Sequence, residues 1–128
     1  MIKPAETDQV AITMDWPATI LEATGTPQDP NFPFDGLNLL PLMKKEVPDF
    51  DRKLFWRMKD QDAVRKGKWK YYRKVSTLKE CTVEDEYLFD LLYDQHEQTN
   101  FKEEFPEVFQ ELKADFIAWN KEMLPYPK

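Results

Sequence analysis

Residues 62–73 read DAVRKGKWKYYR, two short strand-like runs that flank Lys66-Gly67. Glycine accepts the positive φ angle that a two-residue hairpin connection requires, so this stretch predicts two antiparallel strands. Side chains alternate between the two faces of a strand, which makes one face of the second strand mainly aromatic and the other mainly basic. The first face holds Trp69, Tyr71 and Arg73, and the second holds Lys68, Lys70 and Tyr72.

Strands are also expected on both sides of this hairpin. Residues 53–59 contain the apolar run Leu54-Phe55-Trp56 and predict a strand before it. Residues 87–93 are dense in aromatic and aliphatic side chains around Asp90. They predict a strand after the hairpin, which ends in a turn at residues 94–96.

The C-terminal part of the chain predicts one long helix. Its apolar side chains recur at spacings of four and three residues, which places them on one stripe of a helix. The stripe consists of Phe105, Phe109, Leu112, Phe116, Trp119 and Met123. Pro106 suits the first turn, and Pro125 ends the helix. A coiled coil would need a longer and less aromatic pattern, so the stripe is expected to pack across the sheet.

The N-terminal part predicts a strand at residues 9–14 and a helix at residues 16–24. Asp15 as a cap and Pro17 are typical of a helix start, and Gly25 is typical of a left-handed C-terminal cap. Residues 26–36, with three prolines, predict a loop, and the leucines that follow are expected to hold its far end against a core. Pro48 opens a second connector. We therefore divide the chain into an N-terminal arm, residues 1–47, and a compact module, residues 48–128.

Together these elements predict an α+β fold: a small antiparallel sheet of three or four strands packed against a long C-terminal helix and preceded by a strand–helix arm. The 128 residues, 41% of them hydrophobic, suffice for one core. The single cysteine, Cys81, excludes an internal disulfide. No run is apolar enough for a membrane span, and the first residues lack the apolar stretch of a signal peptide.

The net charge of −6 is unevenly distributed. Residues 52–74 contain ten basic and two acidic side chains, a net charge of +8, so the remainder carries −14. Such a window can attract phosphate, sulfate or an acidic polymer, or it can be a solvated hairpin balanced by acidic neighbours in the fold. Nucleic acid fits poorly as a partner, because the chain is acidic overall and contains no RNA-binding or helix-turn-helix motif.

Residues suited to catalysis are scarce. His96 is the only histidine and Ser76 the only serine, so a histidine-rich metal site is excluded and a Ser-His-Asp arrangement has no sequence support. The acidic runs 84–86 and 103–104 are typical of solvated segments. The three glycines lie far apart, which excludes a glycine-rich phosphate loop.

Three stretches resemble recurring segments in the C-terminal part of the sulfatase family. Residues 14–25 with residues 35–42 are similar to the family's D-x-x-P-T-x-L-x-x-x-G and D-G-x-S-L-x-P-L patterns. Phe55-Trp56-Arg57 with residues 63–71 are similar to its A-V-R-x-G-x-W-K strand pair, and residues 88–101 are similar to L-Y-D-L-x-x-D-P-x-E-x-x-N-L. The order and spacing of the stretches match as well.

Three departures from the family pattern affect the shape of turns more than the resemblance to the family. Gln95-His96 replace the usual proline and glycine of the turn after Asp94, and Asn38 stands where serine is common. Residues 75–86 look like an insertion. The resemblance still implies the C-terminal portion of a sulfuric ester hydrolase, whose small subdomain is a four-stranded antiparallel sheet packed on a long helix.

The resemblance also implies that the chemistry of the whole protein lies upstream of this chain. Sulfatases use a formylglycine, formed within a C-x-P-x-R or S-x-P-x-R motif, and a calcium ion. Cys81-Thr82-Val83-Glu84-Asp85 lacks the proline and the arginine of that motif, so Cys81 is not taken as the nucleophile. We expect no catalytic or metal-binding residue in this chain, and we expect the chain alone to hydrolyse no sulfate ester.

In whole sulfatases the C-terminal subdomain docks on the large domain, and some of its loops reach the rim of the substrate pocket. Arg57, Lys68, Lys70 and His96 are the candidates for such rim contacts, although no family motif assigns them this role. The implied partners are the missing N-terminal sulfatase domain and a sulfated small molecule or glycan, with neither nucleic acid nor membrane. The family is often exported, and the sequence itself gives no compartment.

Two further hypotheses follow from the residues. The arm from Gln9 to Gly25 would normally pack into the large domain, so its apolar stripe is expected to drive self-association in isolation. The alternative to the sulfatase interpretation is a free-standing module that binds an anionic or sugar ligand through the basic and aromatic hairpin.

Overall fold

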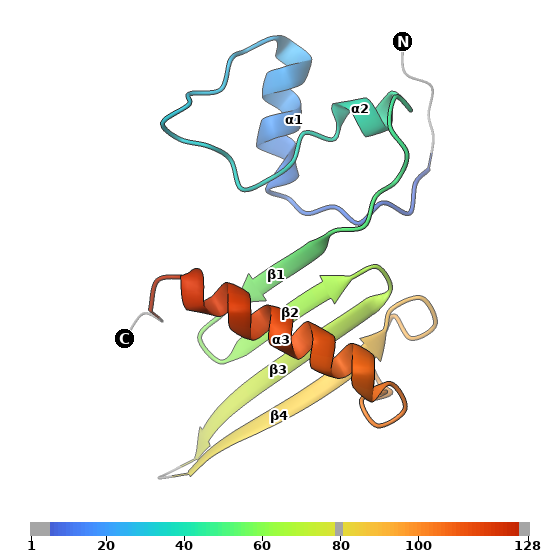
Figure 1. Ribbon diagram of the computed structural model, residues 1–128, viewed down its shortest axis with the longest axis vertical. Helices are drawn as coiled ribbons and strands as arrows, with labels where there is room; N and C mark the ends of the chain where they lie inside the picture. Colours follow the sequence, from blue (N-terminus) through green and yellow to red (C-terminus); the bar gives the residue numbers. More distant parts are fainter. Residues whose placement is uncertain (1–5, 79–80, 126–128) are drawn as a thin grey trace. The chain divides into compact units, whose positions relative to one another are not determined.

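The computed structural model describes the backbone of residues 6–78 and 81–125, and the side chains of these residues except 76–78 and 81–83. The chain forms two compact units, one up to Asp51 and one from Arg52 onward (Figure 1). The first unit contains the helices α1 (Asp15–Thr24) and α2 (Leu40–Met43). The second contains β1 (Lys53–Arg57), β2 (Gln61–Lys66), β3 (Trp69–Leu78), β4 (Cys81–Asp90) and α3 (Pro106–Glu122).

The four strands of the second unit form one antiparallel sheet in the order β1-β2-β3-β4. Helix α3 lies across one face of this sheet, as Figure 1 shows. The predicted α+β class is therefore confirmed, with a four-stranded sheet and a long C-terminal helix. The assignment of residues 1–47 to the tail of a large domain and of residues 48–128 to a subdomain remains a prediction.

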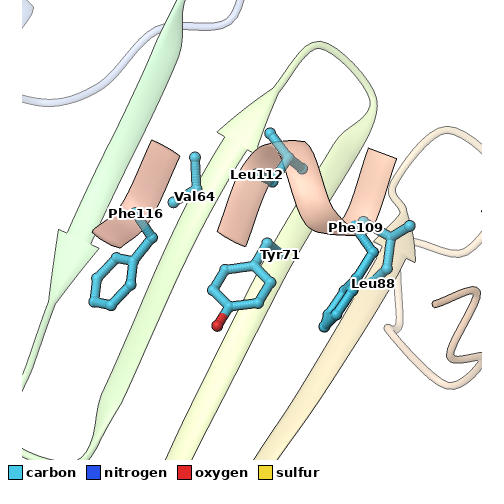
Figure 2. Packing of buried hydrophobic residues seen from close by; sticks show 6 residues of the cluster. All are labelled: Val64, Tyr71, Leu88, Phe109, Leu112 and Phe116. Atoms are coloured by element: carbon cyan, nitrogen blue, oxygen red, sulfur yellow. The ribbon is translucent and has the colours of Figure 1, made fainter. Parts of the chain in front are cut away.

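The core of the second unit lies between the sheet and α3 (Figure 2). The sheet contributes Val64, Tyr71 and Leu88, and the helix contributes Phe109, Leu112 and Phe116. Burial of such side chains stabilises a fold by about 1.5–3 kcal/mol each, which makes this cluster the main source of stability in the unit.

The predicted helical stripe is confirmed at its centre and modified at both ends. Phe109, Leu112 and Phe116 are buried, and Trp119 stacks on Phe55 with ring centroids 4.9 Å apart. Phe105 is the residue before the helix rather than part of it, and its ring packs against Trp69 at 4.8 Å. Met123 follows the last helical residue in an extended conformation, because the backbone leaves the helix before Pro125.

The predicted hairpin exists, but its turn is displaced by one residue. Lys66 pairs with Trp69, so the connection is Gly67-Lys68 rather than Lys66-Gly67. Gly67 has φ +54°, which an L side chain rarely adopts, and this places glycine first in the turn. The prediction that Lys68 shares a strand face with Lys70 is therefore wrong. The Lys68 ammonium lies instead 4.5 Å from the centre of the Trp69 ring.

The alternation along β3 is confirmed where its side chains are described. Tyr71 contacts Phe109 and Arg73 lies over Phe116, so both face the helix. Tyr72 contacts Tyr87 on β4, and Lys70 lies near the Tyr72 ring, so both face the other way. The sheet thus has a helix-covered face and a second face, which we call the open face.

The lengths of the predicted strands differ from the observed ones. The strand predicted at residues 53–59 ends at Arg57, and the one predicted at residues 87–93 begins at Cys81 and ends at Asp90. Residues 75–86, which depart from the sulfatase pattern, prolong the β3–β4 hairpin, and β-branched residues such as Val75 favour this extension. Strand β4 ends where the Asp90 carboxylate accepts the Leu92 N–H and begins a turn.

In the first unit, the predicted helix is confirmed and the predicted strand is wrong. Helix α1 agrees with the predicted helix, and Gly25 ends it in the left-handed conformation. The strand predicted at residues 9–14 is absent, because this segment has no strand to pair with in the described part of the unit. The Gln9 side-chain amide bonds both the N–H and the carbonyl of Phe50 instead.

No helix among the described residues is both long and apolar enough to cross a membrane.

Candidate functional site

The structure separates Arg57 from the other three predicted rim residues. Arg57 ends β1 on the helix-covered face, where its guanidinium donates to Asn120 at 2.9 Å and to the carbonyl oxygen of Leu124. The Lys68 turn lies at the opposite end of the strands, because Arg57 pairs with Asp62 at the beginning of β2. Arg57 therefore ties β1 to the end of α3.

Lys68, Lys70 and His96 lie nearer one another, around the end of β4. Lys70 points from the open face and donates to Glu97 at 2.6 Å. His96 precedes Glu97 in an exposed turn, so the Lys70–Glu97 ion pair connects the open face to that turn. Glu97 itself has φ +56°, an uncommon conformation for a residue with a side chain.

The basic window of residues 52–74 is largely neutralised within the second unit. Lys68 contacts the buried Asp90 at 2.6 Å, and Arg73 contacts the buried Asp62 at 2.7 Å. Lysines of the first three strands form similar pairs with acidic residues of the helix and the turn. These pairs are Lys53–Asp115, Lys66–Glu111 and Lys70–Glu97. Of the two interpretations of the basic window, the structure therefore favours a hairpin whose charges are balanced by acidic neighbours over a patch of unpaired cations that binds anions.

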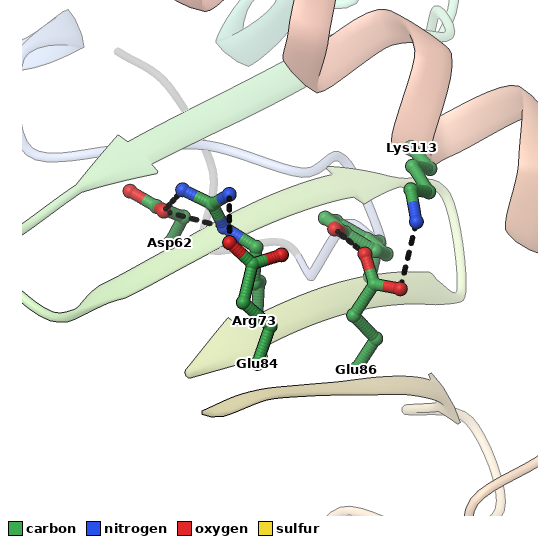
Figure 3. Close-up of polar contacts among 6 residues, drawn as sticks. Asp62, Arg73, Glu84, Glu86 and Lys113 are labelled. Atoms are coloured by element: carbon green, nitrogen blue, oxygen red, sulfur yellow. Dashed lines mark hydrogen bonds and ion pairs between the residues drawn. The ribbon is translucent and has the colours of Figure 1, made fainter. Parts of the chain in front are cut away.

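A polar cluster crosses the core between the sheet and α3 (Figure 3). The Tyr71 hydroxyl donates to Glu86 at 2.7 Å, and Lys113 of α3 donates to the other oxygen of Glu86 at 2.7 Å. Burial opposes the charged form of Glu86, but the hydrogen bonds from Lys113 and Tyr71 outweigh it and lower the pKa of this carboxyl. Burial and the neighbouring Glu86 raise the pKa of Tyr71, so its hydroxyl remains a donor.

The open face contains a hollow of about 410 Å³. Trp56, Ala63 and Tyr72 lie directly opposite one another on β1, β2 and β3, so they share this face. Ala63 is the small residue between two aromatic ones, and the hollow lies over this row. Lys70 and Glu97 line one side of it. The hollow was not predicted from the sequence, although the alternation that placed Tyr71 on one face already placed Ala63 and Tyr72 on the other.

The polar residues of the first sulfatase-like stretch hold backbone segments together. The buried Asp15 carboxylate accepts the N–H groups of Ile12 at 2.8 Å and Leu37 at 2.9 Å. The Thr19 hydroxyl donates to the Asp15 carbonyl and accepts the Leu39 N–H at 2.9 Å. The prediction that Asp15 caps α1 is therefore wrong, because its side chain bonds segments before and after the loop rather than the free N–H groups of the helix.

The third stretch uses its polar residues in the same way. The Asp94 carboxylate accepts the N–H groups of Gln98 at 2.8 Å and Thr99 at 2.7 Å. The Asn100 side chain accepts the Leu88 N–H at 3.0 Å, which holds the following loop along β4. The polar side chains of these sulfatase-like stretches thus form hydrogen bonds to backbone groups, which is a structural rather than a catalytic role.

No group of histidine, cysteine, aspartate and glutamate side chains within the described part of the chain has the arrangement of a metal site.

Comparison with known proteins finds solved structures of similar fold. No protein-family model and no curated protein matches the chain. A solved structure from Bacteroides thetaiotaomicron is similar in fold, and it is described as "Metabolism of multiple glycosaminoglycans by bacteroides thetaiotaomicron is orchestrated by a versatile core genetic locus (BT33336S-sulf)". The TM-score is 0.62 at 20% sequence identity, over 84% of this chain and 24% of that chain.

The class that this comparison supports is a sulfatase-like fold. The chain shares the arrangement of its elements with part of a Bacteroides sulfatase and spans about a quarter of that protein's length.

Proposed function

We propose that this chain is the C-terminal part of a sulfatase, which hydrolyses sulfate esters as a whole protein. Two features that occur together carry the proposal. Three sulfatase-like stretches occur in family order, and the chain that contains them has the fold of part of a sulfatase. The buried Asp15 and the loop-binding Asn100 explain physically why such stretches need these polar residues.

The proposed role of the chain itself is structural, with no catalysis of its own. Sulfate ester hydrolysis requires an attacking oxygen and a means of neutralising the charge that develops on the sulfate. In the family a formylglycine and a calcium ion supply these functions, and both would belong to the missing domain. The prediction is that the purified chain gives no turnover of a chromogenic aryl sulfate above the buffer rate. A rate that persists after a further purification step would contradict it.

The reading frame upstream of residue 1 tests the sulfatase proposal most directly. We expect it to continue in frame and to encode a C-x-P-x-R or S-x-P-x-R motif some hundreds of residues earlier. The longer protein, expressed with its formylglycine-forming enzyme, should then hydrolyse an aryl sulfate or a sulfated sugar. Replacement of the motif cysteine or serine by alanine is the matched control and should abolish the activity. A stop codon directly upstream would refute the proposal.

Lys68, Lys70 and His96 are proposed to lie near the substrate rim of the longer protein. Their common location around the end of β4 supports this grouping. Lys70→Met in the longer protein should raise KM for a sulfated glycan more than it lowers kcat, since a rim contact affects binding rather than chemistry. Arg57→Met is the comparison, because Arg57 contacts the end of α3 and should leave KM unchanged.

The N-terminal arm is proposed to self-associate when the large domain is missing. Trp16 and Ile20 lie one turn apart on α1 and are 53% and 54% exposed. Light scattering should therefore show oligomers that dissociate on dilution, and Trp16→Glu together with Ile20→Glu should yield a monomer. A concentration-independent monomer of the unaltered chain would contradict this proposal. The parent protein, like many members of the family, is proposed to be exported.

The alternative, a free-standing module for an anionic or sugar ligand, is less well supported. Its candidate cations Lys66, Lys68 and Lys70 each already contact a carboxylate at 2.6 Å. Binding of a sulfated polysaccharide by the isolated chain, undiminished by about 0.15 M salt, would favour this alternative, because nonspecific attraction is screened at that ionic strength.

A further inference from the structure

The last segment of the first unit, residues 43–51, is exposed along its whole length. It follows the buried Leu42 of α2 and precedes the strand β1, whose Leu54 is buried. Two adjacent basic residues, Lys44 and Lys45, lie near its start. Exposed polar loop segments of this kind are the preferred places for a protease to cut a folded chain.

Few hydrogen bonds hold the backbone of this segment. Among the described residues, positions 47–51 form no backbone–backbone hydrogen bond, and only the Phe50 backbone is held, by the Gln9 side chain. The end of α2 is closed by two backbone bonds of 2.9 Å, which the N–H groups of Lys45 and Glu46 donate. Because α2 has only four residues, opening its end disrupts little other structure.

The conformation of Lys45 also favours local opening. Its φ angle is +60°, which is unfavourable for a residue with a side chain. A protease binds the segment that it cuts in an extended conformation, so opening relieves this cost and offsets part of the two lost hydrogen bonds. Neither the Lys44 nor the Lys45 ammonium group is held in an ion pair with a described residue, so both side chains are available to a protease pocket.

Most basic residues of the second unit are protected from the same reaction by their backbone. Arg65, Arg73 and Lys74 lie in paired strands, and Lys113 lies within α3. Lys59 belongs to a turn of three residues that joins β1 to β2, and this turn cannot extend without breaking the pairing of the two strands. A protease of basic specificity therefore meets its most accessible described site in the first unit.

We infer that Lys44-Lys45 is a processing site for a protease that prefers lysine or arginine before the cut bond. Water adds to the carbonyl carbon of Lys44 or Lys45, the peptide bond to the next residue breaks, and the new amine takes up the proton. The larger product contains the whole second unit with its core between the sheet and α3, so it stays folded. Cleavage at this site does not depend on the proposed function.

Limited digestion of the whole chain with trypsin tests this site. The first large product should begin at Lys45 or Glu46, as N-terminal sequencing and mass spectrometry would identify, and it should accumulate. Amide exchange in α3 of this product should match that of the uncut chain, because the core is intact. A first cut at any other lysine or arginine, or loss of the product as fast as it forms, would overturn the inference.

Two variants separate the lysine pair from general accessibility. Lys44→Gln with Lys45→Gln should slow the first tryptic cut by at least about tenfold, because glutamine lacks the cation that the trypsin pocket binds. Lys59→Gln with Lys74→Gln, which removes two other exposed lysines, is the matched control and should leave the rate unchanged. A protease that cuts after glutamate should cleave at Glu46 in all three proteins at similar rates. An unchanged tryptic rate in the first variant, or resistance at Glu46, would also overturn the inference.

Discussion

The two units of this chain are stabilised in different ways. The second unit has a continuous apolar core between the sheet and α3, with Tyr71, Leu88 and Phe116 at its centre. The first unit instead uses buried polar groups, Asp15 and Thr19, that bond backbone across a loop. Several of its large apolar residues remain exposed. A similar density of hydrophobic residues therefore produces a continuous apolar core in the second unit, whereas the first unit depends on polar groups that bridge a loop.

Glycines show the same contrast. A Cβ on Gly36 would lie 1.8 Å from the Met14 carbonyl oxygen, so the first unit depends on a close approach of two backbone segments. A Cβ on Gly67 would meet nothing within 4 Å, and only its positive φ favours glycine there. The first unit is therefore sensitive to the size of one residue, whereas the hairpin of the second is sensitive only to backbone conformation.

The largest effect is expected from the core of the second unit. Phe116→Ala should lower the free energy of unfolding by about 3–5 kcal/mol, because it removes a buried ring and leaves a cavity under α3. Urea unfolding followed by circular dichroism measures the loss, and amide exchange should show it in the sheet and α3 but not in α1. Equal loss of protection in α1 would show that the two units unfold together and would remove the contrast between them.

A smaller but localised effect is expected from the first unit. Asp15→Ala should destabilise it by about 1.5–3 kcal/mol, because two backbone N–H groups lose a charged acceptor. Amide exchange of residues 12–19 and 37–42 should accelerate, while exchange in β3 and α3 stays unchanged. Unchanged exchange at Leu37 would contradict the proposed role of Asp15.

The two glycines provide a matched pair for the same comparison. Gly36→Ala must displace the backbone at Met14, whereas Gly67→Ala costs about 1–2 kcal/mol for a left-handed residue alone. The expected result is that Gly36→Ala disrupts the first unit more than Gly67→Ala weakens the second. Near-equal destabilisation in a thermal unfolding series would show that the loop around Gly36 relaxes easily.

Acid should weaken the second unit through the Glu86 cluster. The pKa of Glu86 is lowered from 4.5 in the folded chain, so its contribution is complete above about pH 4.5 and is lost as pH falls through the folded pKa. Glu86→Gln should make urea stability less dependent on pH below about 5, because the amide does not titrate. Glu103→Gln, an exposed carboxyl outside this cluster, serves as the control. Identical pH slopes for both variants would exclude the cluster as an acid-sensitive element.

The smallest effect is expected from the exposed ion pairs of the basic window. Lys66→Met should change stability by only about 0.2–1 kcal/mol, because both Lys66 and Glu111 are more than a third exposed and their attraction is weakened by water. Unfolding at low and at high salt measures this pair. A larger loss of unfolding free energy at physiological salt would mean that Lys66 contributes to the packing of the core and not only to an exposed ion pair.

Much of the fold could be predicted because its signals are local. The spacing of Phe109, Leu112 and Phe116 predicted α3, and the alternation around Tyr71 predicted which face of β3 it covers. The predictions of strands were wrong where strand formation depends on a neighbouring strand, because the sequence does not show which segments pair. The β-branched run before Asp15 forms no strand because the described residues of its unit, 6–51, offer no strand to pair with. Strand β4 begins earlier than expected because β3 continues beside it.

The candidate surface was harder to predict from the sequence than the fold was. The basic residues of the hairpin were evident, but their neutralisation depends on Glu97, Asp90 and Glu111, which come close only after the loop and α3 fold back over the sheet. Arg57 was predicted as a rim residue together with Lys68, and the antiparallel register places the two at opposite ends of the strands.

The sequence by itself determined the α+β class, the C-terminal helix and the likeness to the sulfatase family, since periodicity and ordered stretches are properties of the chain. Only the tertiary structure decided which charges are paired, that Asp15 bonds backbone rather than capping a helix, and that a hollow lies over Ala63. The physical reason is distance along the chain: contacts between residues tens of positions apart depend on how the elements pack, and no local pattern encodes that packing.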